Sequence, residues 1–455
     1  PAYLIGSIRS LYPKLEIENS YCYPENPEAG IDLFLEKLVQ ETEKEHEDIL
    51  EQADETDAMF GELYSWYLRN PEYRSRVQKL VQSAFAGKPE DIISQSVAKA
   101  LYGEVSPYSA TRLERFAACA FAHFLQYGMK LTERVEYEFK PMDMGNVMHE
   151  ALESFAEEVR KRGMKWTELT EQERNEIADR CLDNIVADYG NTVLKSSARN
   201  EYMIERTRRI LRRTVWALQK QLEQGEFQPE GFEVTFGGGR IDRVDIMEDQ
   251  NKVYVKVIDY KTGNTSFDLV YLYHGLQLQL MIYLDGALRV EQKKYPDKEI
   301  IPAGVFYYNI KDPMIQEKID ADVEAVSAGL MKELKMNGLV QADPELVYRM
   351  DSSLGSIPVA FNKDGSFRKN SSVADRTQFA VLGRYVRTKI EKIRSSILEG
   401  DAEVSPYELG KKNACTYCPY MTVCGFDRRL SGYEFRRLKN FSDEELWKAF
   451  DREAE

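Results

Sequence analysis

A change in the spacing of apolar residues near position 237 constrains the fold of this chain more than any other feature. Between about 109 and 224 the apolar side chains recur at helical intervals. By contrast, 237–246 and 252–260 are rich in β-branched and aromatic residues, and the polar residues 248–251 separate these two runs. That pattern is typical of a β-hairpin, so the sequence predicts a sheet that begins near the middle of the chain.

The regions around this hairpin complete the predicted architecture. A helix at about 271–288 and a strand at 303–309 follow it, and mostly helical segments are expected to fill 314–400. Helix, hairpin, helix and strand in this order favour an α/β core with large helical insertions. We divide the chain into three parts: a helical N-terminal region at 1–105, a central domain at 106–430 and a C-terminal helical tail at 431–455.

Two helices before the hairpin have recognisable starting signals. Thr111 and Glu114 have the spacing of a capping box in a helix predicted over 109–130. Asp143 is placed to cap a second helix that ends near residue 162.

The charge balance bears on which partners the chain can bind. The 455 residues carry a formal net charge of −15, which disfavours nucleic-acid binding because phosphate contacts need a basic surface. A nuclease, however, needs carboxylates at its centre and can confine its basic residues to a groove. Because we find neither a long apolar run nor a signal peptide, we expect a cytoplasmic protein. A chain that starts at Pro1 is expected to be a fragment or a processed product.

The second strand of the hairpin carries a carboxylate and a lysine on one face. Asp259 and Lys261 are two residues apart, so their side chains point to the same side. A hairpin turn centred between 249 and 250 would place Asp242 opposite Val257, on the face of Asp259, and Asp245 on the other face. We therefore choose Asp242 as the second metal-binding carboxylate. The alternative for Asp259 and Lys261 is an ion pair on an edge strand.

Two helical pairs could complete such a site. Gly145 and His149 share one helix face, and a glycine there allows a close approach to the imidazole, which is a common metal ligand. Gln279 and Tyr283 are also four residues apart and could present an amide and a hydroxyl to one target. Alternatively, His149 is an ordinary satisfied histidine and Tyr283 only packs in a core.

The cysteines form a separate pattern. Cys415, Cys418 and Cys424 make a short chelating loop, and Cys119 is the best candidate for a fourth ligand. On chemistry alone, zinc held by four thiolates and a [4Fe–4S] cluster fit equally well. Cys22 and Cys181 are expected to be buried thiols without a ligand role.

Taken together, the motifs resemble the RecB-type branch of the PD-(D/E)XK nucleases. The matching residues are Gly145 with His149, Gly239 to Asp242, Asp259 to Lys261, and Gln279 with Tyr283. The resemblance implies a nuclease core made of a mixed sheet flanked by helices. It also implies that Mg²⁺ or Mn²⁺ binds to His149, Asp242, Asp259 and the Tyr260 carbonyl. In this family pattern Lys261 is the catalytic lysine, and Gln279 and Tyr283 position the substrate.

The cysteine spacing resembles the iron–sulfur members of this branch, in particular the AddB subunits of AddAB helicase–nucleases. This resemblance favours a [4Fe–4S] cluster on Cys119, Cys415, Cys418 and Cys424 over zinc. It implies a DNA exonuclease that processes double-strand ends for recombinational repair together with an AddA subunit. Residues 1–105 would then be the end of a helicase-like portion. The chain has no phosphate-binding loop motif for ATP.

Two other functions compete with an active nuclease. The first is a non-catalytic scaffold that keeps a nuclease fold to bind DNA or a partner subunit. The second is a zinc hydrolase, which would need an open position on the cysteine-bound metal, whereas four thiolates leave none. Intact His149, Asp242, Asp259 and Lys261 favour the nuclease.

Overall fold

The computed structural model describes residues 10–12, 26–43, 55–84, 92–103, 109–132, 141–188, 197–237, 239–315, 322–430 and 432–454. Cys22 lies outside the described residues. The chain divides into two compact units, one formed by Pro1–Glu90 with Phe426–Glu434 and the other by Asp91–Gly425 with Phe435–Glu455. In the part of the chain that the structure describes, no helix is long and apolar enough to cross a membrane.

The smaller unit contains three described helices, α2 (Pro27–Glu43), α3 (Glu55–Arg69) and α4 (Pro71–Ala84). They enclose a small aromatic core in which the Phe34 and Phe60 rings stack 4.7 Å apart. The hydroxyl of buried Tyr67 donates a hydrogen bond to the Pro27 carbonyl over 2.6 Å and so ties α3 to the start of α2.

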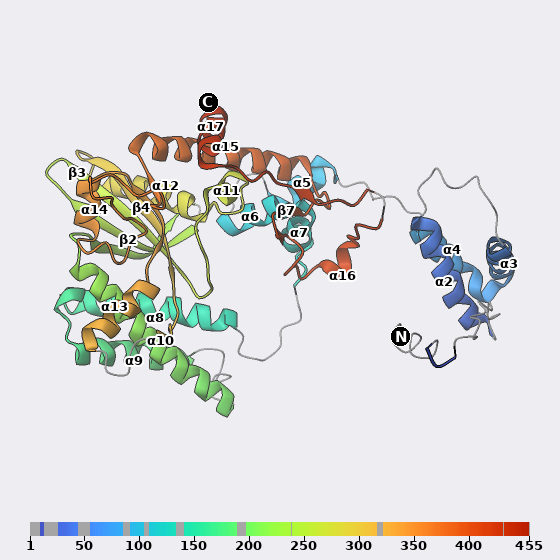
Figure 1. Ribbon diagram of the computed structural model, residues 1–455, viewed down its shortest axis with the longest axis horizontal. Helices are drawn as coiled ribbons and strands as arrows, with labels where there is room; N and C mark the ends of the chain where they lie inside the picture. The colour runs from blue at the N-terminus through green and yellow to red at the C-terminus, as the bar shows by residue number, and fades with distance from the viewer. Residues whose placement is uncertain are drawn as a thin grey trace. The chain divides into compact units, whose positions relative to one another are not determined.

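The larger unit is built on one six-stranded mixed sheet, which agrees with the predicted mixed sheet flanked by helices (Figure 1). β3 pairs with β4 and β5 pairs with β6 in parallel, and the other neighbours are antiparallel. The spatial order follows the chain: β1 (Gln228–Phe236), β2 (Gly239–Glu248), β3 (Lys252–Lys261), β4 (Glu299–Asn309), β5 (Asn337–Gln341) and β6 (Val373–Ala374).

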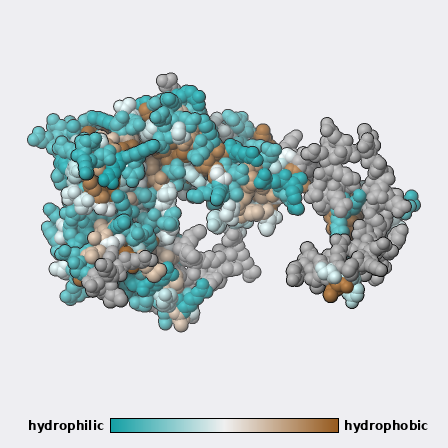
Figure 2. All heavy atoms as spheres, in the orientation of Figure 1, coloured by the Kyte–Doolittle hydropathy of each residue, from teal (hydrophilic) through white to brown (hydrophobic). Residues whose placement is uncertain are grey.

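Helices cover both faces of this sheet, which explains why its central strands are apolar on both sides. On one face lie α8 (Pro141–Lys161), α9 (Glu171–Asp188) and α10 (Ala198–Glu223), with η3 (Trp166–Glu168) between the first two. On the other face lie α6 (Ala110–Ala118), α12 (Gln279–Lys294), α15 (Arg376–Glu399) and α17 (Asp443–Ala454). Hydrophilic side chains cover much of the visible surface of this unit, with smaller hydrophobic areas between them (Figure 2).

Short elements complete the larger unit. The helical ones are α5 (Gln95–Tyr102), α7 (Ala120–His123), the π-helix η2 (Phe124–Gly128), α11 (Leu269–Tyr273), α13 (Val323–Glu333), α14 (Pro344–Met350) and α16 (Met421–Cys424). A separate three-stranded sheet contains β7 (Tyr407–Leu409), β8 (Lys412–Asn413) and β9 (Arg436–Arg437).

Several predicted helices differ from the observed ones. The helix expected over 109–130 is broken at Cys119, whose backbone is extended, and its cap is Ser109 rather than Thr111. Asp143 lies inside the first turn of α8 instead of capping it. The helix expected at 271–288 is two helices, because Gly275 adopts a φ of +79° between them.

The region 314–400 is less helical than expected, since it contributes β5 and β6 to the main sheet. β5 is short, and its asparagine, glycine and glutamine residues dilute the β-branched signal. Gly338 is required there, because a Cβ would lie 1.9 Å from the Val305 carbonyl oxygen of β4.

Candidate active site

The hairpin register brings the two predicted carboxylates together. Val244 lies opposite Val257, and Arg243 opposite Ile258, so the predicted pairing of Asp242 with Val257 is wrong by two residues. An even shift keeps every side chain on its face, so Asp242 and Asp259 do point the same way. The Tyr260 backbone N–H donates a hydrogen bond to Asp242 Oδ2 over 2.7 Å, and both carboxylates are buried.

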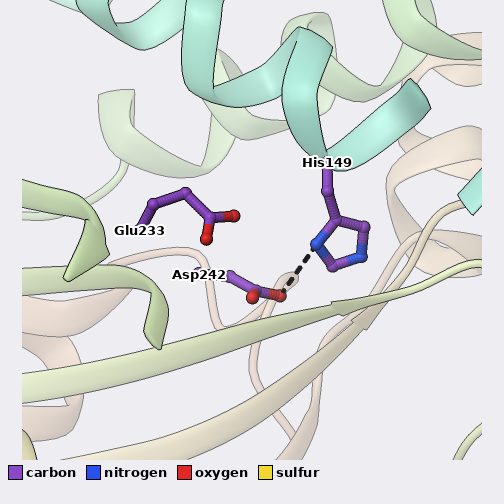
Figure 3. A group of neighbouring side chains, drawn as sticks. All are labelled: His149, Glu233 and Asp242. Carbon is purple, nitrogen blue, oxygen red and sulfur yellow. Dashed lines mark ion pairs between the residues drawn. The ribbon is translucent and has the colours of Figure 1, made fainter. Parts of the chain in front are cut away.

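His149 reaches these carboxylates from α8. Its Nδ1 lies 3.4 Å from Asp242 Oδ2, as Figure 3 shows. One turn earlier, a Cβ on Gly145 would lie 3.3 Å from the Thr262 hydroxyl, so the missing side chain lets α8 pass close to the end of β3. Burial would lower the pKa of His149, but the hydrogen bond and the charge of Asp242 outweigh burial and raise it.

Glu233 is a third carboxylate at this centre that the sequence-based prediction missed. Single ligand atoms of His149, Glu233 and Asp242 all lie within 4.8 Å of one another, an arrangement that could hold a metal ion (Figure 3). Burial, followed by the charge of Asp242, raises the pKa of Glu233 to about 7. The backbone of Glu233 has a φ of +48°, and strained backbone of this kind is often found at functional sites.

A sequence signal for Glu233 did exist. Phe232 pairs with Arg243 and Val234 with Ile241, so Glu233 lies between these pairs and faces Asp242 across the β1–β2 hairpin. Recognising that hairpin requires β1 to be predicted as a strand. β1 begins with glutamine, proline, glutamate and glycine, which are poor strand formers.

Asp259 and Lys261 form an ion pair at the end of β3. β3 lies in the interior of the sheet, so the alternative of an edge-strand ion pair is wrong. Burial and the nearby charge of Asp242 raise the pKa of Asp259 to about 7, although Lys261 opposes this shift. Like-charged acids held this close are stabilised by a cation between them, so the donor set fits a divalent metal.

The predicted pair on α12 contacts the lysine. Lys261 Nζ donates to Gln279 Oε1 over 2.8 Å, and Gln279 Nε2 donates to the Tyr283 hydroxyl over 2.9 Å. The ring of Tyr307 lies 5.5 Å from the same ammonium. This chain of contacts orients Lys261 toward Asp259.

Glu114 supports that pair from α6 and was missed as a site-related residue. Its Oε1 accepts the backbone N–H groups of Leu278 and Gln279 over 2.7 and 2.9 Å. Leu278, the residue at the N-cap of α12, makes no capping bond with its own side chain, so Glu114 supplies the cap from another helix. Burial raises the pKa of Glu114 to about 7, against the two backbone hydrogen bonds that lower it.

Asp245 lies on the opposite face of the hairpin, as predicted. Its carboxylate accepts from Arg243 Nε over 2.6 Å and lies 2.9 Å from Lys256 Nζ, and all three side chains are buried. Burial would raise the pKa of Asp245, but these two cations lower it. Asp245 therefore serves a buried ion network rather than the metal-binding face.

The four predicted cysteine ligands gather in one region of the larger unit. Cys119 separates α6 from α7 and shares a small cluster with Tyr420 and Cys418. Burial, followed by the neighbouring thiols of Cys119, Cys418 and Cys424, raises the pKa of Cys415 to about 12. Thiols this close to one another fit a metal or cluster that binds them as thiolates. Cys181 is buried in the core on α9, as expected for a thiol without a ligand role.

Comparison with known proteins agrees with this geometry. Similar proteins, each named as the B-type subunit of an ATP-dependent helicase/deoxyribonuclease, occur in Lachnoclostridium phytofermentans (39% identity), a Thermoanaerobacter species (34%) and Clostridium acetobutylicum (31%). The alignments cover 100%, 88% and 100% of this chain, respectively, but only 40%, 37% and 41% of those proteins. The chain thus spans about 40% of the length of the relatives it matches. The family model of the PD-(D/E)XK nuclease superfamily matches residues 107–425. This chain belongs to the PD-(D/E)XK nuclease superfamily.

Proposed function

We propose that this chain is the nuclease portion of an AddB-type subunit and hydrolyses DNA phosphodiester bonds with Mg²⁺ or Mn²⁺. The observation that carries the proposal is the convergence of His149, Asp242, Asp259 and Lys261 from one helix and one hairpin. The name of the relatives, which includes the word deoxyribonuclease, supports DNA as the substrate.

The metal would be held by His149, Asp242, Asp259 and the Tyr260 carbonyl, and Glu233 is a further carboxylate within reach. A divalent cation supplies a more acidic water molecule and neutralises charge on the phosphate. Lys261, held by Gln279, places a positive charge beside the reacting phosphate. The Tyr283 hydroxyl, which accepts from Gln279, is placed to orient the substrate.

The larger assembly and the cysteine site belong to the same proposal. We infer an exonuclease that processes double-strand ends in the cytoplasm for recombinational repair, in complex with an AddA-type subunit that supplies ATP-driven unwinding. The four cysteines would hold a [4Fe–4S] cluster, with zinc as the alternative. Iron and sulfide analysis after anaerobic purification distinguishes the two, because a zinc site contains neither.

The nuclease is tested by removing one ligand and the lysine separately. Asp259→Ala should lower Mg²⁺-dependent cleavage of DNA by more than about 100-fold, because metal binding is lost. Lys261→Ala should lower kcat while calorimetry still detects metal binding, because a lysine binds no cation. The measurements are the rate of cleavage of labelled DNA and metal titration of each purified variant.

The exposed Asp364→Ala variant provides a matched loss of one carboxylate outside the site and should cleave normally. Full activity in a folded Asp259→Ala protein would reject the site. Wild-type protein that binds DNA and metal without cleaving would instead support the scaffold.

A further inference from the structure

A second feature of the larger unit is a groove beside the catalytic centre. It has a volume of about 540 Å³ and lies between the end of β1, α12 and α15. We call it the α12–α15 groove. It is lined by Thr235, Phe236 and Gly237 of the β1–β2 hairpin, by α12 residues between Met281 and Lys293, and by α15 residues between Gly383 and Arg394.

The groove is basic in a strongly acidic chain. Its charged lining comprises four cations, Arg289, Lys293, Arg387 and Arg394, and two acids, Asp285 and Glu391. One carboxylate, that of Asp285, serves both Arg289 and Arg387, over 2.6 and 2.8 Å. Both arginine side chains are more than half exposed, so the excess positive charge faces solvent.

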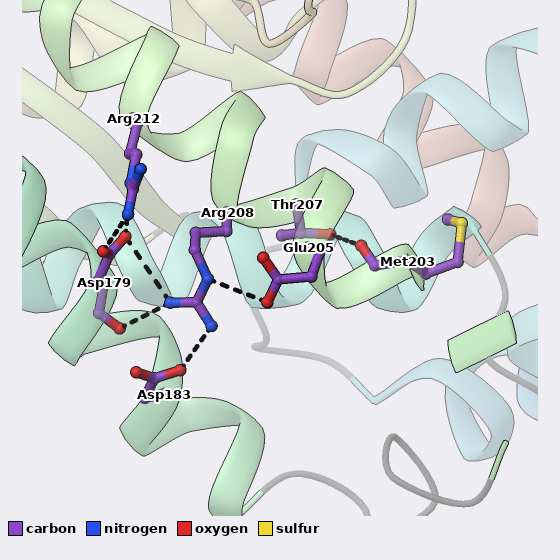
Figure 4. Close-up of polar contacts among 7 residues, drawn as sticks. All are labelled: Asp179, Asp183, Met203, Glu205, Thr207, Arg208 and Arg212. Carbon is purple, nitrogen blue, oxygen red and sulfur yellow. Dashed lines mark hydrogen bonds and ion pairs between the residues drawn. The ribbon is translucent and has the colours of Figure 1, made fainter. Parts of the chain in front are cut away.

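A larger arginine-lined cavity shows why this excess matters. The cavity between α9, α10 and α13 has a volume of about 620 Å³ and five arginines. However, Asp179, Asp183 and Glu205 pair with Arg208 and Arg212, as Figure 4 shows. With Glu171 in the lining and Asp312 on Arg209, five carboxylates match its five arginines. Its arginines therefore join helices, whereas the α12–α15 groove keeps surplus charge.

The position of the groove relates it to the catalytic centre. Glu233 faces Asp242, and three residues further along the same hairpin Phe236 pairs with Gly239, about 10 Å away at the rise of a strand. On α12, Tyr283 contacts the catalytic pair, and Arg289 and Lys293 follow about 9 and 15 Å further along the helix. Two elements thus lead from the catalytic carboxylates into the groove.

The groove also has an aromatic wall next to the site. The Phe236 ring packs on Gly286, where a Cβ would lie only 2.6 Å from the ring, and it meets the Tyr283 ring edge-on at 5.9 Å. An aromatic ring next to a line of cations is the combination that binds single strands, because bases stack while phosphates pair with the charges.

We propose that the α12–α15 groove binds the single DNA strand next to the bond that is cleaved, with Arg289 and Lys293 contacting its phosphates. The inference rests on the proposed function only in taking DNA as the substrate. It accounts for how a chain of net charge −15 can bind a polyanion: the basic residues are concentrated where the strand lies.

The test reverses two exposed cations of the groove in the full chain. Arg289→Glu with Lys293→Glu should weaken binding of fluorescein-labelled oligothymidylate, measured by anisotropy in EDTA, by about ten-fold. It should also lower the slope of log K against log salt concentration by roughly 1.4, for two phosphate contacts on a single strand. Cleavage of bis(p-nitrophenyl) phosphate, too small to reach the groove, should be unchanged.

The matched control is Lys363→Glu with Lys369→Glu, which alters the net charge equally in an exposed loop of the other sheet face. Equal weakening by both double variants, unchanged binding in the groove variant, or no binding by the wild type would each overturn the proposal. A wild type that binds the strand but never cleaves it with Mg²⁺ would reject the proposed function and leave the groove in place.

Discussion

At the scale of single residues, two acids of one hairpin show how the face of a strand decides a role. Asp242 and Asp245 are three residues apart on β2, so they point to opposite faces. Asp242 has His149, Glu233 and the other carboxylate of the site around it, an arrangement that favours a cation. Asp245 already has two cations, Arg243 and Lys256, and needs no metal.

This contrast gives opposite expectations for the two amides. Asp242→Asn should weaken Mg²⁺ binding by roughly 10–100-fold in calorimetry and change the free energy of unfolding little. Asp245→Asn should bind Mg²⁺ nearly normally but lose about 3–5 kcal/mol in urea unfolding, because it leaves Arg243 and Lys256 buried without their counter-ion. The reverse ranking of metal affinities would show that the two roles are exchanged.

At the scale of elements, one carboxylate links the helix that carries a cysteine ligand to the catalytic lysine. Glu114 on α6 caps α12, the first residue of α12 is Gln279, and Gln279 accepts from Lys261. Five residues after Glu114 the same segment reaches Cys119. α6 therefore connects the cysteine site to the active site without contacting the metal-binding carboxylates.

Removing that cap should affect both stability and turnover. Glu114→Ala should cost about 1–2 kcal/mol of unfolding free energy, as for other lost N-caps, and should lower kcat because Gln279 no longer fixes Lys261. Glu114→Gln keeps an oxygen that can accept the two N–H groups and should retain most of the activity. If Glu114→Ala loses stability but keeps its kcat and its pH–rate profile, the role of Glu114 is structural only.

The same residue predicts a pH effect with a definite sign. Burial raises the pKa of Glu114 from 4.5 to about 7 in the folded chain, so the folded state binds this proton more tightly than the unfolded state. Its contribution to stability is therefore complete below pH 4.5 and is lost as the pH rises toward 7. Glu114→Gln should lack this part of the pH dependence in urea unfolding, and parallel curves for both proteins would contradict the assignment.

At the scale of the whole molecule, the cysteine site closes a long stretch of chain. Cys119 precedes the nuclease motifs and Cys415, Cys418 and Cys424 follow them, so one cluster joins both ends of the nuclease domain. A link across roughly 300 residues restricts the unfolded chain and stabilises the folded one by a few kcal/mol.

Breaking this link should loosen the domain. Cys119→Ala should lose the visible absorption of an iron–sulfur cluster, lower the Tm, and expose both ends of the nuclease domain to proteolysis. The buried Cys181→Ala, which removes a thiol outside the cluster, serves as the control and should keep its iron. A Cys119→Ala protein that retains both iron and Tm would exclude Cys119 as a ligand.

The sequence by itself determined the features that depend on neighbouring residues. The period of two in β2 and β3 and the polar turn between them placed Asp242, Asp259 and Lys261 on one face, even with the turn centred one residue too early. The short spacing of Cys415, Cys418 and Cys424 predicted a chelating loop without any tertiary information. The family resemblance added His149, Gln279 and Tyr283 to the site before any contact was visible.

Tertiary structure alone decided the contacts between distant segments. Glu233 reaches the centre only because β1 pairs with β2, and Glu114 acts on α12 across 164 residues. The break at Gly275 and the addition of β5 and β6 to the sheet also depend on neighbours in space. The physical reason is range: hydrophobic period and turn chemistry act over a few residues, whereas strand order, capping between helices and the path of the α12–α15 groove arise only when the core packs.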